Sequence, residues 1–202
     1  EQTHGIDQVL TPLLQELIAS RDENVAELAM GTMSAQARFV QAQRRMNLPL
    51  SELPAELFHD VLAQWQALRR DREQRQRERV LQVLRGGYDE GSSRLGMLTR
   101  LVGSFGNGLR AAIDLEHAGF PLFVSGLSRA SKQPRELAVL SCHERQATRF
   151  ALALRAAGLK PEDMRKQFLL IQSDLAMPKG ADSIAQDRAL SLIAGTPSGG
   201  AR

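Results

Sequence analysis

Residues 57–65, LFHDVLAQW, contain the side chains of this sequence that are best suited to chemistry. His59 is followed directly by Asp60, and Gln64 comes four residues after Asp60. An imidazole that accepts a phosphoryl group must present one ring nitrogen to the donor, and a neighbouring carboxylate supports its basicity. A nearby amide can orient an attacking water in the reverse, hydrolytic reaction. His59 is therefore a candidate phosphoacceptor, with Asp60 and Gln64 as supporting residues.

The six positions from His59 to Gln64 resemble the H-D-x-x-x-Q box of one class of sensor kinases. The resemblance implies phosphotransfer with a response regulator as partner. No asparagine box and no glycine-bearing ATP lid follow in the sequence, so autophosphorylation is not expected and passive phosphotransfer stays open. The alternative is structural, with His59 as a solvated residue on the polar face of a helix.

Helix geometry separates the histidines, because successive residues turn by about 100° around the axis. His59 falls well away from an apolar face, and we expect it to be exposed with Asp60 beside it. That face comprises Leu57, Phe58, Val61, Leu62, Trp65 and Leu68. His143 begins HERQAT, which resembles a second sensor-kinase box, H-E-x-x-x-T. It lies near the centre of another apolar face and is expected in or near the core, held by a hydrogen bond, unless this face is an oligomer interface. His117, near a helix C-terminus, suits the helix dipole.

A cluster of arginines follows this apolar stretch and is a candidate anion or partner patch. It comprises Arg69, Arg70, Arg72, Arg75, Arg77 and Arg79. Asp71, Glu73 and Glu78 interrupt the run, and no aromatic residues interleave for base stacking, so nucleic-acid binding is not expected. The alternative is a solvated helix that carries internal ion pairs.

No motif indicates a cofactor, a metal or an enzyme. The four histidines are scattered and lack H-x-x-x-H spacing. The glycine-rich stretch 103–108, GSFGNG, lacks the Lys-Ser/Thr of a phosphate-binding loop and indicates a turn between helices. Ser141, Cys142 and His143 are adjacent, but helical neighbours point about 100° apart, which disfavours a nucleophile–base pair. Cofactors and metals are not expected, and catalysis is not favoured.

Composition limits the remaining classes. The chain has 202 residues, 43% of them hydrophobic, with a formal net charge of +3. That charge is too small to indicate a nucleic-acid-binding protein. No apolar run approaches the roughly 18 residues that a membrane-spanning helix needs. The single cysteine, Cys142, excludes an internal disulfide and fits a reducing, cytoplasmic setting.

Proline, glycine and capping residues recur at helix-like intervals, which predicts an all-α fold. We expect an antiparallel helical bundle with one long helix over about residues 51–85, beginning at Ser51. The glycines and polar residues of 86–93 mark a boundary between an N-terminal helical subdomain, 1–88, and a C-terminal helical subdomain, 89–195. A flexible tail, 196–202, should follow.

Helix limits are also predicted within both parts. Asp22 precedes a long helix that ends before Asn47. Gly119 ends one segment, and later helices open at Pro121, Pro134 and Pro161. A last helix is expected to be capped by Asp182 or Ser183.

Two stretches, MSAQARFVQAQRRMNLPLSELPAELFHDVLAQW (33–65) and LSCHERQATRFALALRAAGL (140–159), resemble an uncharacterised all-helical family of alphaproteobacteria, the domain of unknown function numbered two-three-three-six. The resemblance implies a helical fold and a bacterial cytoplasmic setting. It implies no catalytic residue.

Three interpretations follow from the sequence. The first is a non-enzymatic helical protein-interaction module, a bacterial scaffold or signalling protein whose amphipathic helices bind a protein partner or a second copy. The second is a histidine phosphotransfer or dimerisation-like module that uses His59 and a response regulator. The third and least favoured is an arginine-dependent nucleic-acid-binding protein.

Overall fold

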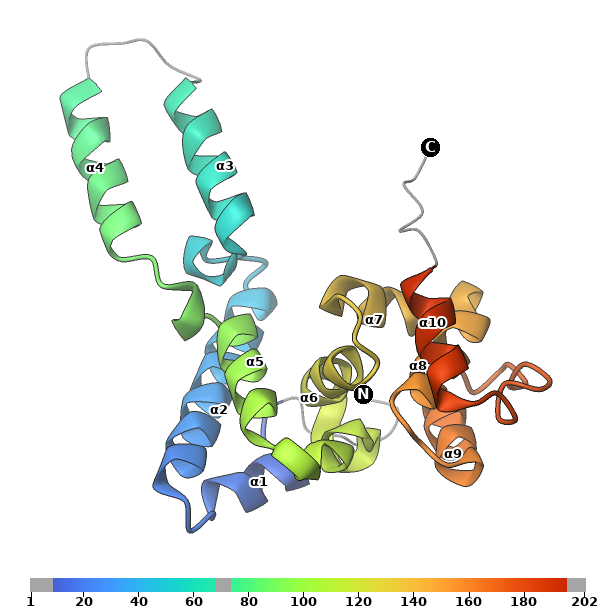
Figure 1. The fold of residues 1–202 in the computed structure, drawn as a ribbon. Helices are drawn as coiled ribbons and strands as arrows, with labels where there is room; N and C mark the ends of the chain where they lie inside the picture. Colours follow the sequence, from blue (N-terminus) through green and yellow to red (C-terminus); the bar gives the residue numbers. More distant parts are fainter. Residues whose placement is uncertain (1–8, 68–73, 196–202) are drawn as a thin grey trace.

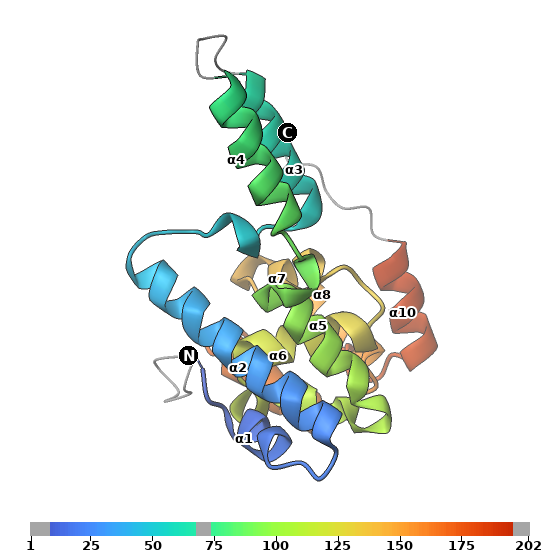
Figure 2. The same cartoon turned by 90° about the vertical axis from the view of Figure 1, so that its left-hand side faces the viewer.

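The computed structural model describes residues 9–67 and 74–195, and within these ranges the regular secondary structure is entirely helical. The prediction of an all-α fold with a helical bundle is confirmed. The helices form a body and a two-helix hairpin that projects from it (Figures 1 and 2). The expected tail, 196–202, lies outside the described residues.

Three helices from two distant segments form the first half of the body. They are α1 (Pro12–Ile18), α2 (Glu23–Arg44) and α5 (Arg94–Ser104). The Asp22 side chain accepts hydrogen bonds from the backbone N–H of Asn24 and of Val25, so α2 begins where the sequence predicts it. α5 runs beside α2 (Figure 2).

A single apolar cluster joins these helices to the start of α6. Its buried members are Leu13, Leu14, Ala29, Leu98, Leu101, Val102, Ala112, Ala118 and Leu122. The cluster contains residues from both sides of the boundary expected between residues 88 and 89. The helices before this boundary therefore share a core with those that follow it.

The second half of the body contains five helices. They are α6 (Leu115–Ala130), α7 (Arg135–Ser141), α8 (Ala147–Ala156), α9 (Pro161–Ile171) and α10 (Gln186–Ala194). They enclose the largest apolar cluster, which includes Phe123, Phe150 and Phe168. The Phe150 ring lies 6.4 Å from that of Phe123 and 5.8 Å from that of Phe168, measured between centroids.

Several predicted helix limits are found in this half, and one is wrong. Gly119 has φ 72° and ψ 161° and breaks the helical path within α6, just before Pro121. Pro161 is the first residue of α9. The last helix does not begin at Asp182 or Ser183, because residues 181–183 form a turn and Ala185 is the residue before α10.

The predicted long helix over residues 51–85 is wrong. The chain forms a 3-10 turn at η2 (Leu50–Glu52), then α3 (Ala55–Ala67) and α4 (Gln74–Gly86), which run side by side in opposite directions (Figure 1). One continuous helix would hold Phe58 and Leu81 about 35 Å apart. The hairpin instead brings them into one apolar cluster with Leu62. Burial of these side chains favours the hairpin, although helix formers fill the segment.

A reciprocal pair of glutamates joins the hairpin to the body. Glu52 accepts a hydrogen bond from the backbone N–H of Arg94, at the start of α5 (2.8 Å). Glu90, in the 3-10 turn η3 (Glu90–Ser92), accepts one from the N–H of Ala55, at the start of α3 (3.3 Å). The Glu52 carboxylate, which precedes α3, therefore lies at the positive N-terminal end of α5. The Glu90 carboxylate, which precedes α5, lies at the N-terminal end of α3.

Candidate functional site

The candidate phosphoacceptor set lies on α3. His59, Asp60 and Gln64 are all exposed, as expected for His59. The His59 ring meets the rings of Phe58 and Tyr88 edge-on, at centroid distances of 5.3 and 6.1 Å.

The three side chains do not form one cluster. Gln64 is five residues beyond His59 and so lies about 140° around the helix from it. Within the described ranges, no hydrogen bond joins His59 to either Asp60 or Gln64. The phosphoacceptor role stays a prediction, with Asp60 better placed than Gln64 to influence the imidazole.

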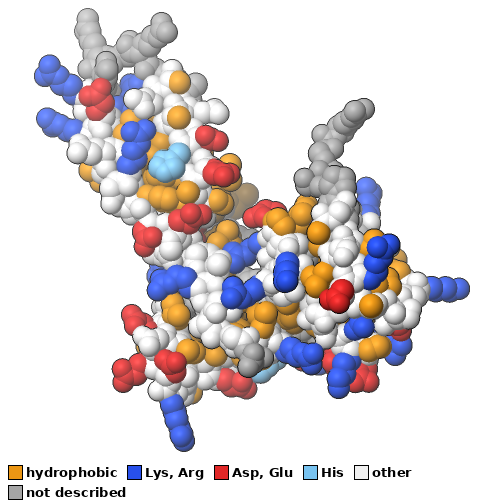
Figure 3. All heavy atoms as spheres, viewed as in Figure 1, with side chains coloured by type: hydrophobic (Ala, Val, Ile, Leu, Met, Phe, Trp, Pro, Cys, Tyr) orange, Lys and Arg blue, Asp and Glu red, His pale blue; other side chains and the backbone are white. Residues whose placement is uncertain are grey.

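The arginine patch lies only partly within the described residues. Arg69, Arg70 and Arg72 fall outside them. Arg75 and Arg79 are exposed on α4, and Arg77 is half-buried. Basic side chains of the hairpin gather over α4, with Glu78 as the acid among them, whereas the other acidic side chains lie over α3 (Figure 3). The α3 sequence contains Glu56 and Asp60 but no lysine or arginine. The hairpin therefore has a basic and an acidic side.

The apolar face predicted for α3 is only half covered. Phe58 and Leu62 are buried against α4, whereas Leu57, Val61 and Trp65 are 53, 43 and 40% exposed. On α4, Val80 and Val83 are 42 and 73% exposed. The hairpin therefore leaves large apolar side chains of both helices in contact with solvent.

Helical geometry places these residues on the same face of the hairpin. One shallow hollow is lined by Gln66 of α3 and by Glu78 and Gln82 of α4, so these three polar residues lie on the same face of the hairpin. Leu57 lies about 180° around α3 from Gln66, and Val80 lies about 160° around α4 from both Glu78 and Gln82. Val61 is next to Leu57, and Val83 is next to Val80. The opposite face of the hairpin is therefore apolar, with Trp65 at its border.

The other histidines do not form a second site. The prediction that His143 is in the core is wrong, because the helix expected there is broken at residues 142–146 and His143 is exposed. Its Nδ1 accepts a hydrogen bond from the N–H of Arg145 at the start of η5 (Glu144–Gln146). The Nε2 atom of His117 lies 3.1 Å from a carboxylate oxygen of Glu16.

Cys142 is a poor nucleophile. Burial raises the pKa of its thiol to about 12, although a hydrogen bond with Ser141 opposes the shift. Its Sγ donates to the carbonyl oxygen of Ala138 (3.4 Å). The glycine-rich stretch 103–108 connects α5 to the 3-10 segment η4 (Gly106–Ile113), in agreement with a turn between helices.

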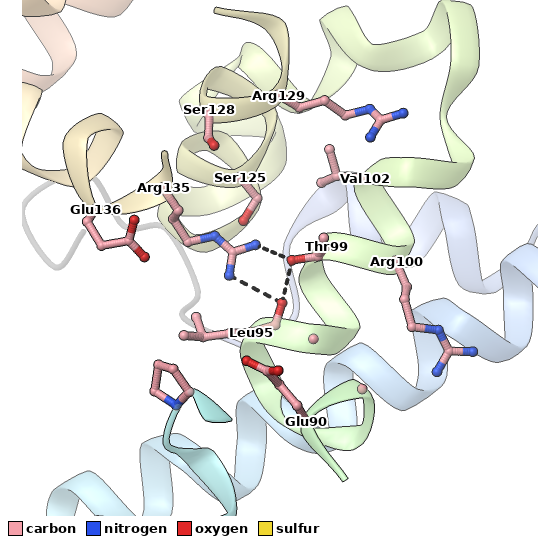
Figure 4. A pocket seen from close by; sticks show the side chains of 13 residues that line it. Glu90, Leu95, Thr99, Arg100, Val102, Ser125, Ser128, Arg129, Arg135 and Glu136 are labelled. Atoms are coloured by element: carbon pink, nitrogen blue, oxygen red, sulfur yellow. Dashed lines mark hydrogen bonds between the residues drawn. The ribbon is translucent and has the colours of Figure 1, made fainter. Parts of the chain in front are cut away.

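The structure also contains a cleft that the sequence did not predict. It has a volume of about 530 Å³ and lies between α5, α6 and α7, beside the base of the hairpin (Figure 4). The lining residues are Pro54, Glu90, Gly91, Leu95, Gly96, Thr99, Arg100, Val102, Ser125, Ser128, Arg129, Arg135 and Glu136. No spacing in the sequence relates its arginines, because each comes from a different helix and only packing brings them together.

Arg135 is the central charged group of the cleft. It is half-buried, and its guanidinium donates to the carbonyl oxygen of Leu95 (3.2 Å) and to Oγ1 of Thr99 (2.7 Å; Figure 4). Its Nε is buried without a hydrogen-bond partner. Burial lowers the pKa of Arg135, and the nearby charge of Glu136 opposes that shift.

No group of three or more metal-ligating side chains occurs in the described ranges. None of the helices found there combines the length and the apolar character needed to cross a membrane.

Comparisons with known proteins gave no relative. No family model matches the chain, and no match was found among curated proteins or among solved structures. Membership of the helical family that residues 33–65 and 140–159 resemble stays a prediction.

Proposed function

We propose that this protein is a non-catalytic helical interaction module, a scaffold or signalling adaptor, and that it binds a second copy of itself through the α3–α4 hairpin. The observation that carries the proposal is the apolar face formed by Leu57, Val61, Val80 and Val83. A face of this kind on a projecting element is typical of a protein-binding surface.

The energetics of the hairpin support a partner. Helices of 13 residues, such as α3 and α4, are marginal in water unless they bury an apolar face. The hairpin cluster buries Phe58, Leu62 and Leu81, while residues of comparable size on the same two helices stay exposed. Two hairpins placed face to face would cover those residues and form a four-helix bundle.

Charge supports a second copy as the partner. Asp60 lies near the apolar face on α3, and Arg79 lies near it on α4. When α3 of one hairpin packs on α4 of another, the acidic side of each copy meets the basic side of the other. The surface is therefore complementary to itself, which a two-fold symmetric dimer requires.

The oligomeric state tests this proposal directly. We expect sedimentation equilibrium of the full chain to show a reversible dimer, and we expect Val83→Glu to dissociate it because a charge would enter the apolar interface. Leu169→Glu is the matched control, because Leu169 is 57% exposed on α9, far from the hairpin in sequence. A strictly monomeric wild type, or a Val83→Glu dimer as stable as the wild type, contradicts the proposal.

A second candidate function is phosphotransfer through His59. It is supported by the exposure of the imidazole on the first helix of a hairpin, with Asp60 next to it. We expect incubation with phosphorylated response regulators to yield an acid-labile phosphoryl group that is lost in His59→Gln. His143→Gln is a matched control, because His143 is also exposed and also precedes an acid, Glu144. Absence of transfer from any regulator, or equal loss in both variants, contradicts it.

A further inference from the structure

The arginines of the α5–α6–α7 cleft lack the ion pairs that two other basic residues of the body make. Arg165 lies 2.6 Å from Asp182, and Lys166 lies 3.3 and 2.8 Å from Asp114 and Glu116. Within the described ranges, no carboxylate lies within ion-pair distance of Arg100, Arg129 or Arg135 in the cleft.

The guanidinium of Arg135 is electrostatically incomplete. Its hydrogen-bond acceptors, a carbonyl and a hydroxyl, are both neutral, and its Nε has none. A half-buried cation whose hydrogen bonds go only to neutral acceptors keeps part of its desolvation cost. The nearby charge of Glu136 opposes the effect of burial without removing it, and a hydrogen-bonded anion would offset more of that cost. Each terminal nitrogen of Arg135 uses one of its two N–H groups in these bonds, so a second N–H remains on each.

The rest of the cleft suits a small molecule that carries a negative group. Its volume lies within the range of ligand pockets, about 300–1,000 Å³. Leu95, Val102 and Pro54 supply apolar surface. Arg135 points into the cleft toward Leu95 and Thr99, whereas Arg100 and Arg129 extend from α5 and α6 at its edge with their guanidinium groups directed away from Arg135 (Figure 4).

The two acids of the cleft limit the charge of such a ligand. Glu90 is engaged with the N–H of Ala55, and Glu136 is exposed in the first turn of α7. Against the three arginines, they leave the cleft with a small positive excess. A ligand with one anionic group and an apolar body fits this balance better than a polyanion does.

We propose that the cleft binds a small organic anion, with its carboxylate or phosphate group on Arg135 and with Arg100 and Arg129 at the rim. The hydroxyls of Ser125 and Ser128 already donate to the carbonyl oxygens of Pro121 and Gln133, both at 2.7 Å. Their oxygen atoms remain as acceptors for polar hydrogens of the ligand. This binding site is independent of self-association through the hairpin.

Amide chemical shifts of the full chain test the site with two probes. Sodium phosphate and sodium butyrate are titrated separately against sodium chloride at matched ionic strength, which distinguishes a phosphate from a carboxylate ligand. We expect saturable shifts at the amides of Gly91, Gly96 and Thr99 with at least one probe, at a Kd of about 1 mM or tighter. We expect Arg135→Gln to weaken binding at least tenfold, as estimated for a lost charged hydrogen bond.

Two further variants distinguish loss of the binding site from a general loss of charge or of folding. Arg188→Gln removes an exposed arginine from α10 and should leave the affinity unchanged. The double variant Arg100→Gln, Arg129→Gln leaves the hydrogen bonds of Arg135 in place and should weaken binding even if Arg135→Gln disturbs the fold. No saturable shift with either probe overturns the proposal, and so does an equal affinity in the double variant and in Arg188→Gln.

Discussion

The body and the hairpin of this protein differ in the size of the apolar cluster that each one buries. In the second half of the body, the rings of Phe123, Phe150 and Phe168 lie within one large buried cluster. In the hairpin, Phe58 stacks on Tyr88 at a centroid distance of 3.9 Å, and the surrounding cluster is small. Regions with few buried apolar contacts open at lower free energy than the core does. The comparison therefore assigns most of the stability to the body, and it agrees with the proposal that the hairpin is the surface that binds a partner.

The largest expected effect comes from removing a ring of the body core. Phe150→Ala should lower the free energy of unfolding by about 3–5 kcal/mol, because it leaves a cavity between the rings of Phe123 and Phe168. Phe58→Ala is the matched change in the hairpin and should mainly accelerate amide exchange in α3 and α4. Urea unfolding and hydrogen exchange measure both effects. Equal losses of global stability would show that hairpin and body unfold as one unit.

An intermediate effect is expected where the two regions meet. A Cβ at Gly96 would lie 2.2 Å from the carbonyl oxygen of Glu90, so Gly96→Ala must displace η3 or α5. We expect a loss of about 1–3 kcal/mol, measured by urea unfolding. Gly103→Ala is the control on the same helix, where a Cβ meets nothing within 4 Å. It should be neutral or stabilising by up to about 1 kcal/mol, and an equal loss in both variants would contradict this account.

Near neutral pH, the smallest effect on stability is expected from the thiol of Cys142, which lies in the body. Because burial raises its pKa to about 12, above an unfolded value of about 8.5, its contribution to stability is complete below about pH 8.5. That contribution is lost as the pH rises toward 12. Alkylation by iodoacetamide at pH 8 should be at least about a hundredfold slower in the folded than in the urea-unfolded chain.

The alkylation rate of Cys142 also distinguishes opening of the body from opening of the hairpin. In Phe58→Ala the alkylation of Cys142 should stay slow, because only the hairpin opens. In Phe150→Ala it should become faster. Rapid alkylation of the folded wild type would contradict the partial burial of Cys142.

The sequence by itself determined the elements whose signals are local. Asp22 and Pro161 mark helix starts because a side-chain cap and a fixed φ act on the adjacent turn. The exposure of His59 also followed from the sequence, because its apolar neighbours occupy one face of a single helix. These features depend on residues only a few positions apart.

Tertiary structure decided whatever depends on distant residues. Helix propensity favoured one long helix over residues 51–85, and the packing of Phe58 with Leu81 and Tyr88 divided it into a hairpin. The apolar pattern around His143 indicated the core, but the break at residues 142–146 exposes this residue. The arginine cleft lies between α5, α6 and α7, which follow one another in the chain. Their order does not determine which of their side chains line the cleft, because that depends on how the helices pack. Local patterns encode helices and their faces, whereas the face that becomes buried is decided by which segments pack together.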